Sequence, residues 1–226
     1  MFKVALAGAV IVAASVTGCS TPEPSSVVFG IDGSGSSQGM SKVYFAGVSA
    51  WLNDHDQDFH ATALGLTGTS GDRKLCPTVS ADIVGEGGSG DARAEDRRMD
   101  RAAFLSQVAE LAACLDRNRG VSDLVAFEGI STALGSGGTA VLFTDALIHH
   151  DGVDVDRPTL TEPSHDRDFL NQFTSTARID AVTVEVHGAG AGSGLTDTEL
   201  AGLHRRWDAL VTAKGGTLTT FTAAIA

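Results

Sequence analysis

Residues 27–37 read VVFGIDGSGSS, a compact apolar run that ends in Asp32 and is followed by a turn rich in glycine and serine. A short apolar run with β-branched residues, bounded by such a turn, predicts a buried strand. A second run, TAVLFT at residues 139–144, predicts the most fully buried strand of the chain, and Asp145 follows it directly. Each of these two strands therefore has an aspartate at its carboxyl end.

Working outward, short apolar runs alternate with segments of helical spacing. Further strands are predicted at residues 59–66, 75–84 (broken by Pro77), 181–186 and 217–222. Helices are predicted at 39–53, 99–116, 124–134, 166–176 and 196–214, and exposed loops at 85–96 and 149–168. Strands separated by helices of this length favour right-handed crossovers. The predicted fold class is doubly wound α/β, a mainly parallel sheet with helices on both faces.

The amino-terminal segment has the composition of a secretion signal. Lys3 precedes an apolar stretch over residues 4–16, which is shorter than the roughly 20 residues that span a bilayer. The stretch ends Val16-Thr17-Gly18-Cys19, which resembles the bacterial lipobox. That resemblance implies a signal peptide at 1–18 and a diacylglycerol on Cys19, with fatty acyl chains such as palmitate. We therefore expect a lipoprotein anchored in the cell membrane on its extracytoplasmic face, with a polar tether at 19–26 and one domain at 27–226.

The charge balance of the chain limits its partners. The whole sequence has 16 basic and 28 acidic side chains and a net charge of −12. Removal of residues 1–18 takes away Lys3 only, which leaves 15 basic side chains and a net charge of −13. Such a chain repels nucleic acid and anionic lipid, and it has no basic stripe to override this. The same charge is compatible with binding cations.

Two cysteines remain in the mature region, Cys76 and Cys114. Because thiols outside the cytoplasm tend to be oxidised, we expect a Cys76–Cys114 disulfide. Lipidation of Cys19 leaves no odd thiol. Neither cysteine lies in a glycine-rich or histidine-flanked context, which argues against a catalytic thiol.

Oxygen donors cluster where the predicted sheet would bind a ligand. Doubly wound sheets bind ligands at the carboxyl ends of their strands. Asp32, Ser34 and Ser36 follow the first strand and Asp145 follows the central one, while Ser122 lies in Gly120–Asp123 at the start of a helix. Carboxylates and hydroxyls from separate loops suit a hard divalent cation that keeps some water and one open position.

This arrangement resembles the von Willebrand factor type A domain. The family's metal-ion-dependent adhesion site joins a D-x-S-x-S loop, a threonine from a second loop, and an aspartate after a buried central strand. VVFGIDGSGSS is similar to the first element and VLFTDA to the last, and the likeness covers residues 27–226. The resemblance implies Ser34 and Ser36 as direct ligands, with Asp32 and Asp145 acting mainly through water. The cation would be Mg²⁺, or Mn²⁺ or Ca²⁺ instead.

Two positions depart from the family pattern. The second loop has Ser122-Asp123 where the family usually has threonine followed by an acid or amide, and serine keeps the hydroxyl. Thr132 and Thr139 are alternatives, but the first falls within a predicted helix and the second at the wrong end of a strand. The glycine that usually follows the last aspartate is Ala146 here.

A serine hydrolase is the main enzymatic alternative. Gly35 to Gly39 matches the G-x-S-x-G nucleophile elbow, with Ser37 as nucleophile, Asp145 as the orienting acid and His187 or His204 as base. In that fold, however, strands that build the oxyanion hole precede the elbow, whereas this elbow follows the first strand. His204 also lies beside two arginines in a predicted helix.

Other sites have weaker support. Residues 35–42 lack the G-K-[ST] ending of a phosphate-binding loop. His149 and His150, with acidic neighbours up to Asp166, lack a regular ligand spacing and are typical of an exposed loop.

The sequence thus favours a non-enzymatic surface lipoprotein that binds a protein partner's carboxylate through a divalent cation. We expect neither a small-molecule substrate nor a nucleic-acid partner. The other alternative is an envelope assembly or scaffold module whose metal site is degenerate.

Overall fold

The structure is a computed structural model that describes residues 24–34, 37, 39–66, 76–86, 88–118, 126–150, 153–154, 157–172 and 176–225. Cys19, Ser36, Ser122 and the predicted signal segment 1–18 lie outside the described residues.

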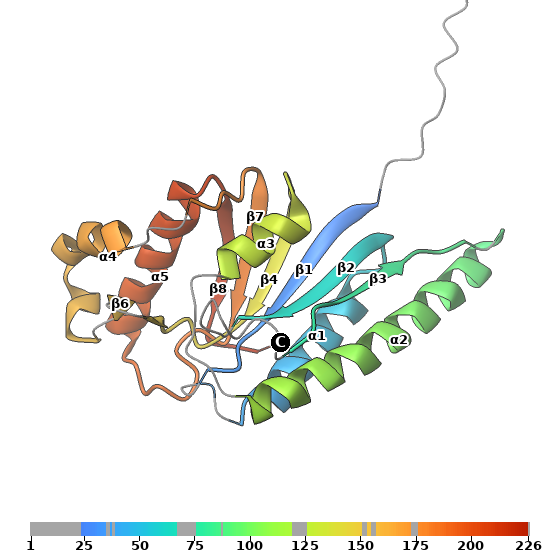
Figure 1. Cartoon of the computed structure of the whole chain (residues 1–226), viewed down its shortest axis with the longest axis horizontal. Coiled ribbons are helices and arrows are strands. Elements are labelled where there is room, and N and C mark those ends of the chain that lie inside the picture. The colour runs from blue at the N-terminus through green and yellow to red at the C-terminus, as the bar shows by residue number, and fades with distance from the viewer. Residues whose placement is uncertain are drawn as a thin grey trace, which may run out of the picture.

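A six-stranded sheet forms the centre of the molecule, in the order β3-β2-β1-β4-β7-β8 (Figure 1). The strands are β1 (Ser25–Ile31), β2 (Phe59–Gly65), β3 (Val79–Ile83), β4 (Gly138–Phe143), β7 (Val182–His187) and β8 (Thr217–Thr222). Only the pairing of β2 with the edge strand β3 is antiparallel among these six strands; all the others are parallel. The doubly wound, mainly parallel fold class predicted from the sequence is therefore confirmed.

Helices cover both faces of the sheet (Figure 1). α1 (Ser41–Asp54) and α2 (Gly90–Arg117) lie on one face, while α3 (Ala126–Leu134) and α5 (Asp197–Ala213) lie on the other. The smaller elements are β5 (His149–His150), β6 (Val153–Asp154), η1 (Arg157–Thr161), η2 (Pro163–His165) and α4 (Asp166–Gln172). None of the described helices is long and apolar enough to cross a membrane.

Alternation along the central strands divides the core in two. Val28 and Ala140 pack with the α3 and α5 side, whereas Phe29, Val141 and Phe143 pack with the α1 and α2 side. Successive side chains of a strand point to opposite faces, so a strand covered on both faces is apolar throughout. This is why β1 and β4 were recognisable as continuous apolar runs.

The predicted loop at residues 85–96 is wrong from residue 90 onward, where α2 already begins. Ser89 caps this helix by accepting a hydrogen bond from the backbone N–H of Ala92 at 3.3 Å. The first buried side chain of α2 is Phe104, so its first turns carry no apolar stripe. Ser89, Gly90 and Asp91 belong to the start of this helix, but the same residue types are also typical of loops, which is why the sequence predicted a loop here.

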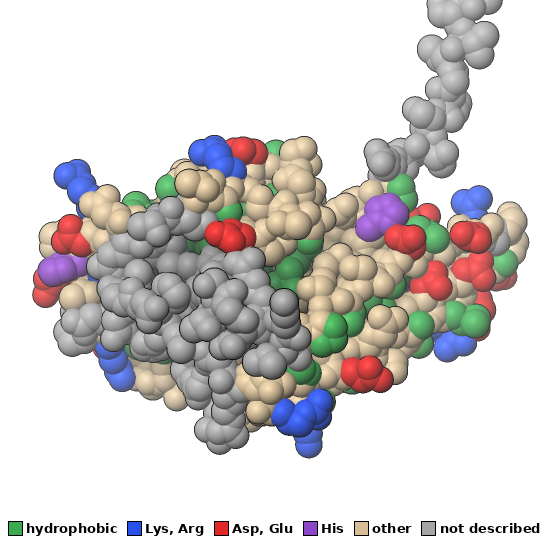
Figure 2. Space-filling model, viewed as in Figure 1, with side chains coloured by type: hydrophobic (Ala, Val, Ile, Leu, Met, Phe, Trp, Pro, Cys, Tyr) green, Lys and Arg blue, Asp and Glu red, His purple; other side chains and the backbone are tan. Residues whose placement is uncertain are grey.

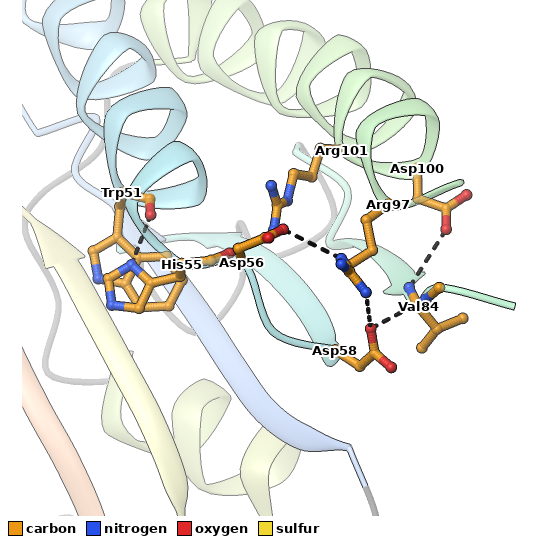
Figure 3. A network of polar contacts seen from close by, with 9 residues as sticks. Trp51, His55, Asp56, Asp58, Val84, Arg97, Asp100 and Arg101 are labelled. Atoms are coloured by element: carbon orange, nitrogen blue, oxygen red, sulfur yellow. Dashed lines mark hydrogen bonds and ion pairs between the residues drawn. The ribbon is translucent and has the colours of Figure 1, made fainter. Parts of the chain in front are cut away.

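Ion pairs hold this exposed half of α2 in place (Figure 3). Arg97 contacts Asp56 at 3.3 Å and Asp58 at 3.1 Å, both in the loop before β2. Arg101 donates to the carbonyl of His55 at 2.5 Å in the same loop. The amino-terminal half of α2 is thus fixed by polar contacts with the loop that precedes β2.

A disulfide joins Cys76 and Cys114, with their Cα atoms 5.7 Å apart. Cys76 precedes β3, and Cys114 lies in the last turn of α2. The bridge therefore fastens the carboxyl-terminal end of α2 to the chain that enters the edge strand.

On the opposite face, an ion cluster holds α4 against α5. Asp166 accepts from Arg205 Nε at 2.5 Å and from Arg206 Nε at 3.0 Å. Burial acts to raise the pKa of Asp166, but the hydrogen bonds and charges of the two arginines outweigh it, so the pKa is lowered. The ion cluster therefore favours the charged carboxylate.

We expect Asp166→Asn to destabilise the protein by about 3 kcal/mol at neutral pH, because Arg206, which is 2% exposed, loses its charged partner. Since the folded pKa is depressed, this stabilisation is present above the ordinary value of 3.8 and is lost as the pH falls through the lower folded value. Urea denaturation at pH 7 and at decreasing pH measures both effects. Asp180→Asn, at an exposed ion pair, is the control; equal losses for both variants would contradict the prediction.

Candidate functional site

The candidate site lies at the carboxyl ends of β1 and β4, the two adjacent strands at the centre of the sheet. From β1 the chain continues to β2 on one side, while β4 leads on to β7 on the other, so this is the topological switch point of the sheet. Asp32 and Asp145 follow these strands, and each is 1% exposed. The backbone N–H of Asp32 donates to the carbonyl of Phe143 at 2.9 Å, which draws the two loop starts together.

Among the described residues, three donors give hydrogen bonds to the carboxylate of Asp32. Its Oδ1 accepts from the backbone N–H of Ser34 at 2.7 Å. Its Oδ2 accepts from Ser37 Oγ at 2.9 Å and from Thr144 Oγ1 at 2.7 Å. A carboxylate has about four acceptor positions, so most of the capacity of Asp32 is used within the protein. These bonds fix the orientation of the Asp32 carboxylate between the two loops.

Tyr44 forms a second layer beneath the loop. Its hydroxyl lies 3.2 Å from Ser37 Oγ, and the side chain is fully buried. Burial raises the pKa of Tyr44 far above its usual range. The hydrogen bond with Ser37 acts to lower this pKa, while the negative charges of Asp32 and Asp145 raise it further. The phenol therefore stays neutral, and both carboxylates lie within electrostatic reach of it.

The loop after β4 is held by its own set of bonds. Asp145 Oδ1 accepts from the backbone N–H of Leu147 at 2.9 Å, and Thr144 Oγ1 accepts from that of Ala146 at 3.0 Å. Ala146 has φ 62°, a left-handed conformation, in which a non-glycine residue costs about 1–2 kcal/mol. Its carbonyl accepts from Trp207 Nε1 at 2.9 Å. Tertiary bonds thus hold an alanine in the conformation for which glycine is better suited.

Gly33, between Asp32 and Ser34, is required for packing. A Cβ atom at Gly33 would lie 2.8 Å from Leu115 Cβ in α2, which is closer than real Cβ contacts come. Ser34 itself is 4% exposed. The first variable position of the D-x-S-x-S sequence is therefore small because α2 lies directly behind it.

The structure brings together Asp32 and Asp145 from separate loops and holds Ser34 on Asp32. Ser36 and Ser122, the other two predicted ligands, lie outside the described residues. Thr132 donates to the carbonyl of Glu128 at 2.7 Å within α3, and Thr139 pairs with Val27 near the start of β4. Of the two alternative threonines, Thr139 thus lies at the end of β4 opposite the site.

The contacts expected of a hydrolase do not form around Ser37. Among the described residues its hydroxyl contacts Asp32 and Tyr44. His187 Nε2 lies 3.4 Å from Glu185, and the ring of His204 stacks on Phe221. Neither candidate base therefore contacts the candidate nucleophile.

Sequence reasoning missed the residues that hold Asp32 in place. Thr144 could have been noticed, because it precedes Asp145 at the end of the best predicted strand. Tyr44 is the only tyrosine of the chain, but nothing local indicates that it lies beneath the loop. Leu115 gave no signal beyond its place in an apolar stripe.

No group of three or more His, Cys, Asp or Glu residues in the described part of the chain could hold a metal ion by itself. A hollow of about 330 Å³ is lined by Asp82, Val84, Glu86, Asp96, Met99 and Asp100. Acidic side chains gather over this end of the molecule (Figure 2), but it contains none of the predicted ligands.

Comparisons with known proteins give distant likenesses. No protein-family model and no curated protein sequence matches this chain. It is similar to the pilus adhesin SpaC from Lactobacillus rhamnosus GG in the open conformation, with TM-score 0.43 and 13% identity over 88% of this chain and 28% of the adhesin. It is similar to the manganese-loaded Plasmodium vivax TRAP protein, with TM-score 0.40 and 14% identity over 88% of this chain and 69% of that protein.

A third likeness is to the human COPII-coat protein Sec24c, with TM-score 0.36 and 14% identity over 89% of this chain and 30% of that protein. The chain therefore spans less than a third of the length of the adhesin and of Sec24c. Likenesses at this level identify no ligand. The strand order and directions place the chain in the doubly wound, mainly parallel α/β fold class.

We expect Thr144→Val to destabilise the protein by about 1–3 kcal/mol. The substitution keeps the shape but removes the donor to Asp32 and the acceptor for the Ala146 N–H, which leaves buried polar groups without partners. Chemical denaturation measures the loss. Thr217→Val, at an exposed residue of β8, is the matched control and should change stability by at most about 0.5 kcal/mol. Equal effects of the two variants would show that the bond to Asp32 is unimportant.

Proposed function

We propose that this chain is an extracytoplasmic, membrane-anchored binding protein that engages a protein partner through a divalent cation at the carboxyl edge of β1 and β4. One observation carries the proposal. Asp32 and Asp145 are almost fully buried at the switch point of the sheet, and the donors that the described residues supply to Asp32 are all neutral. Buried carboxylates are stabilised by a positive charge, from a side chain or from a metal ion.

The donor set fits a hard cation. Carboxylate and hydroxyl oxygens are the ligands that Mg²⁺, Mn²⁺ and Ca²⁺ prefer. Ser34, with Ser36 and Ser122, would supply hydroxyl oxygens, while Asp32 and Asp145 would act through water. The three bonds already made by Asp32 favour this division, because they leave little capacity for direct coordination. A bound divalent cation with an open position supplies a site for a carboxylate oxygen of the partner.

The overall charge of the chain adds to the reasons for a cation. A protein with a net charge of −12 repels an acidic partner unless a local positive charge offsets the repulsion. A cation at the switch point would supply that charge at one place and so select where a carboxylate docks. No covalent chemistry is needed, and we propose a binding protein rather than an enzyme.

The anchor would place the site away from the membrane. Lipidation of Cys19 would leave a short polar tether before β1, which begins at Ser25. β1 has seven residues and spans about 23 Å from the tether to the site. Its start and the candidate site lie at opposite edges of the sheet (Figure 1). A partner would therefore approach from outside the envelope surface.

Isothermal titration calorimetry with Mn²⁺ and Mg²⁺ tests the metal site. We expect the wild type to bind and the Asp32→Asn and Ser34→Ala variants to bind about 10–100-fold more weakly, because outer-shell and direct ligands both set affinity. At 100 times the dissociation constant the cation should stabilise the folded wild type by about 2.7 kcal/mol. Asp180→Asn, an exposed carboxylate in an ion pair, should bind like the wild type. Absence of both binding heat and stabilisation in the wild type would leave the scaffold alternative.

Cys19→Ser tests the anchor. The variant lacks the thiol that accepts the lipid, so we expect it to move from the detergent phase to the aqueous phase on detergent partitioning of cells. Thr21→Ala, two residues further along, should remain with the membrane fraction. Retention of the Cys19→Ser protein in the detergent phase would refute lipidation at this residue.

A further inference from the structure

We infer that the last turn of α2, fastened by the Cys76–Cys114 disulfide, positions the cation-binding loop, so that the bridge sets the affinity of the loop for its cation. The inference rests on the proposed function. It assigns positioning roles to Leu115 and Asp116, which are distant from the site in sequence and are not themselves ligands.

Leu115 lies against the backbone at the carboxyl ends of β1 and β2. A Cβ atom at Gly33 would lie 2.8 Å from Leu115 Cβ, and one at Gly65 would lie 2.7 Å from Leu115 Cδ2. Leu115 is itself 2% exposed. Its position therefore determines where the backbone between Asp32 and Ser34 can lie, since a closely packed interior transmits small displacements.

Asp116, the next residue, holds the other end of the same loop. Its carboxylate accepts a hydrogen bond from Ser41 Oγ, in the first residue of α1. Met40 at the N-cap position supplies no side-chain cap, so this carboxylate from α2 provides a negative charge at the start of α1, where the helix dipole is positive. Two adjacent residues of α2 thus contact the segment from Gly33 to Ser41 near its beginning and at its end.

The disulfide fixes the turn that carries both residues. Cys114 directly precedes Leu115, and Asn118 Nδ2 donates to the Cys114 carbonyl at 3.1 Å to close the helix end. α2 has 28 residues and is about 42 Å long. The ion pairs of Arg97 and Arg101 act near its amino-terminal half (Figure 3), too far away to define the position of its last turn.

Calorimetry with Mn²⁺ on a set of variants tests the inference. We expect the Cys76→Ser/Cys114→Ser double variant and Leu115→Ala to raise the dissociation constant about tenfold, the size of effect that supporting residues have on metal affinity. Leu115→Met, which conserves volume, should restore most of the affinity. Leu111→Ala is the matched control, because it removes the same atoms from a buried position one turn earlier in α2. It should lower thermal stability comparably and change affinity less than about twofold.

Hydrogen exchange of the metal-free proteins supplies a second readout. Residues 32–41 should exchange faster in the double cysteine variant and in Leu115→Ala than in the wild type and Leu111→Ala. If the wild type binds Mn²⁺ but neither affinity nor exchange differs between Leu115→Ala and Leu111→Ala, the positioning role is refuted while the proposed function stands. If the wild type does not bind Mn²⁺, the proposed function fails, and the link between the bridge and cation affinity fails with it.

Discussion

Asp32 carries a carboxylate where only 1% of the residue is exposed, and in the described part of the chain three neutral donors bond it. These donors come from the loop after β1 and from the end of β4. The carboxylate therefore links the two central strands, on either side of which the chain builds the sheet outward in opposite directions. An isolated buried carboxylate is strongly unfavourable. The neighbouring groups are linked to it through its donors: the phenol of Tyr44 contacts Ser37, and the N–H of the left-handed Ala146 bonds Thr144.

The support for that group comes from three elements of the fold. Thr144 acts from the sheet, Tyr44 from α1, and Leu115 from the end of α2. At the proposed site none of these side chains would need to contact the cation to influence its binding, because each limits where the loop can lie. In the inferred arrangement the disulfide holds the last turn of α2, while the ion pairs of Arg97 fix the amino-terminal half of the same helix.

The parts of the fold that were predictable from sequence are those with a local signal. β1 and β4 are apolar throughout because both of their faces are covered, and α5 carries a capping box at Thr196 and Glu199 that marks its start. The first turns of α2 were not predictable as a helix, because Arg97 and Arg101 bind a distant loop where an apolar stripe would normally pack. The antiparallel direction of β3 likewise has no local signature.

The sequence by itself determined that two aspartates follow the two most apolar strands, and this was sufficient to predict that Asp32 and Asp145 lie at the same end of the sheet. This was possible because a strand buried on both faces has an unbroken run of apolar residues, which is visible locally in the sequence. The tertiary structure alone decided which groups hold the carboxylate. Thr144 and Asp32 are 112 residues apart in the chain, and Leu115 reaches Gly33 only through the packing of α2. Such contacts depend on how whole elements pack in space, which no local pattern of residues records.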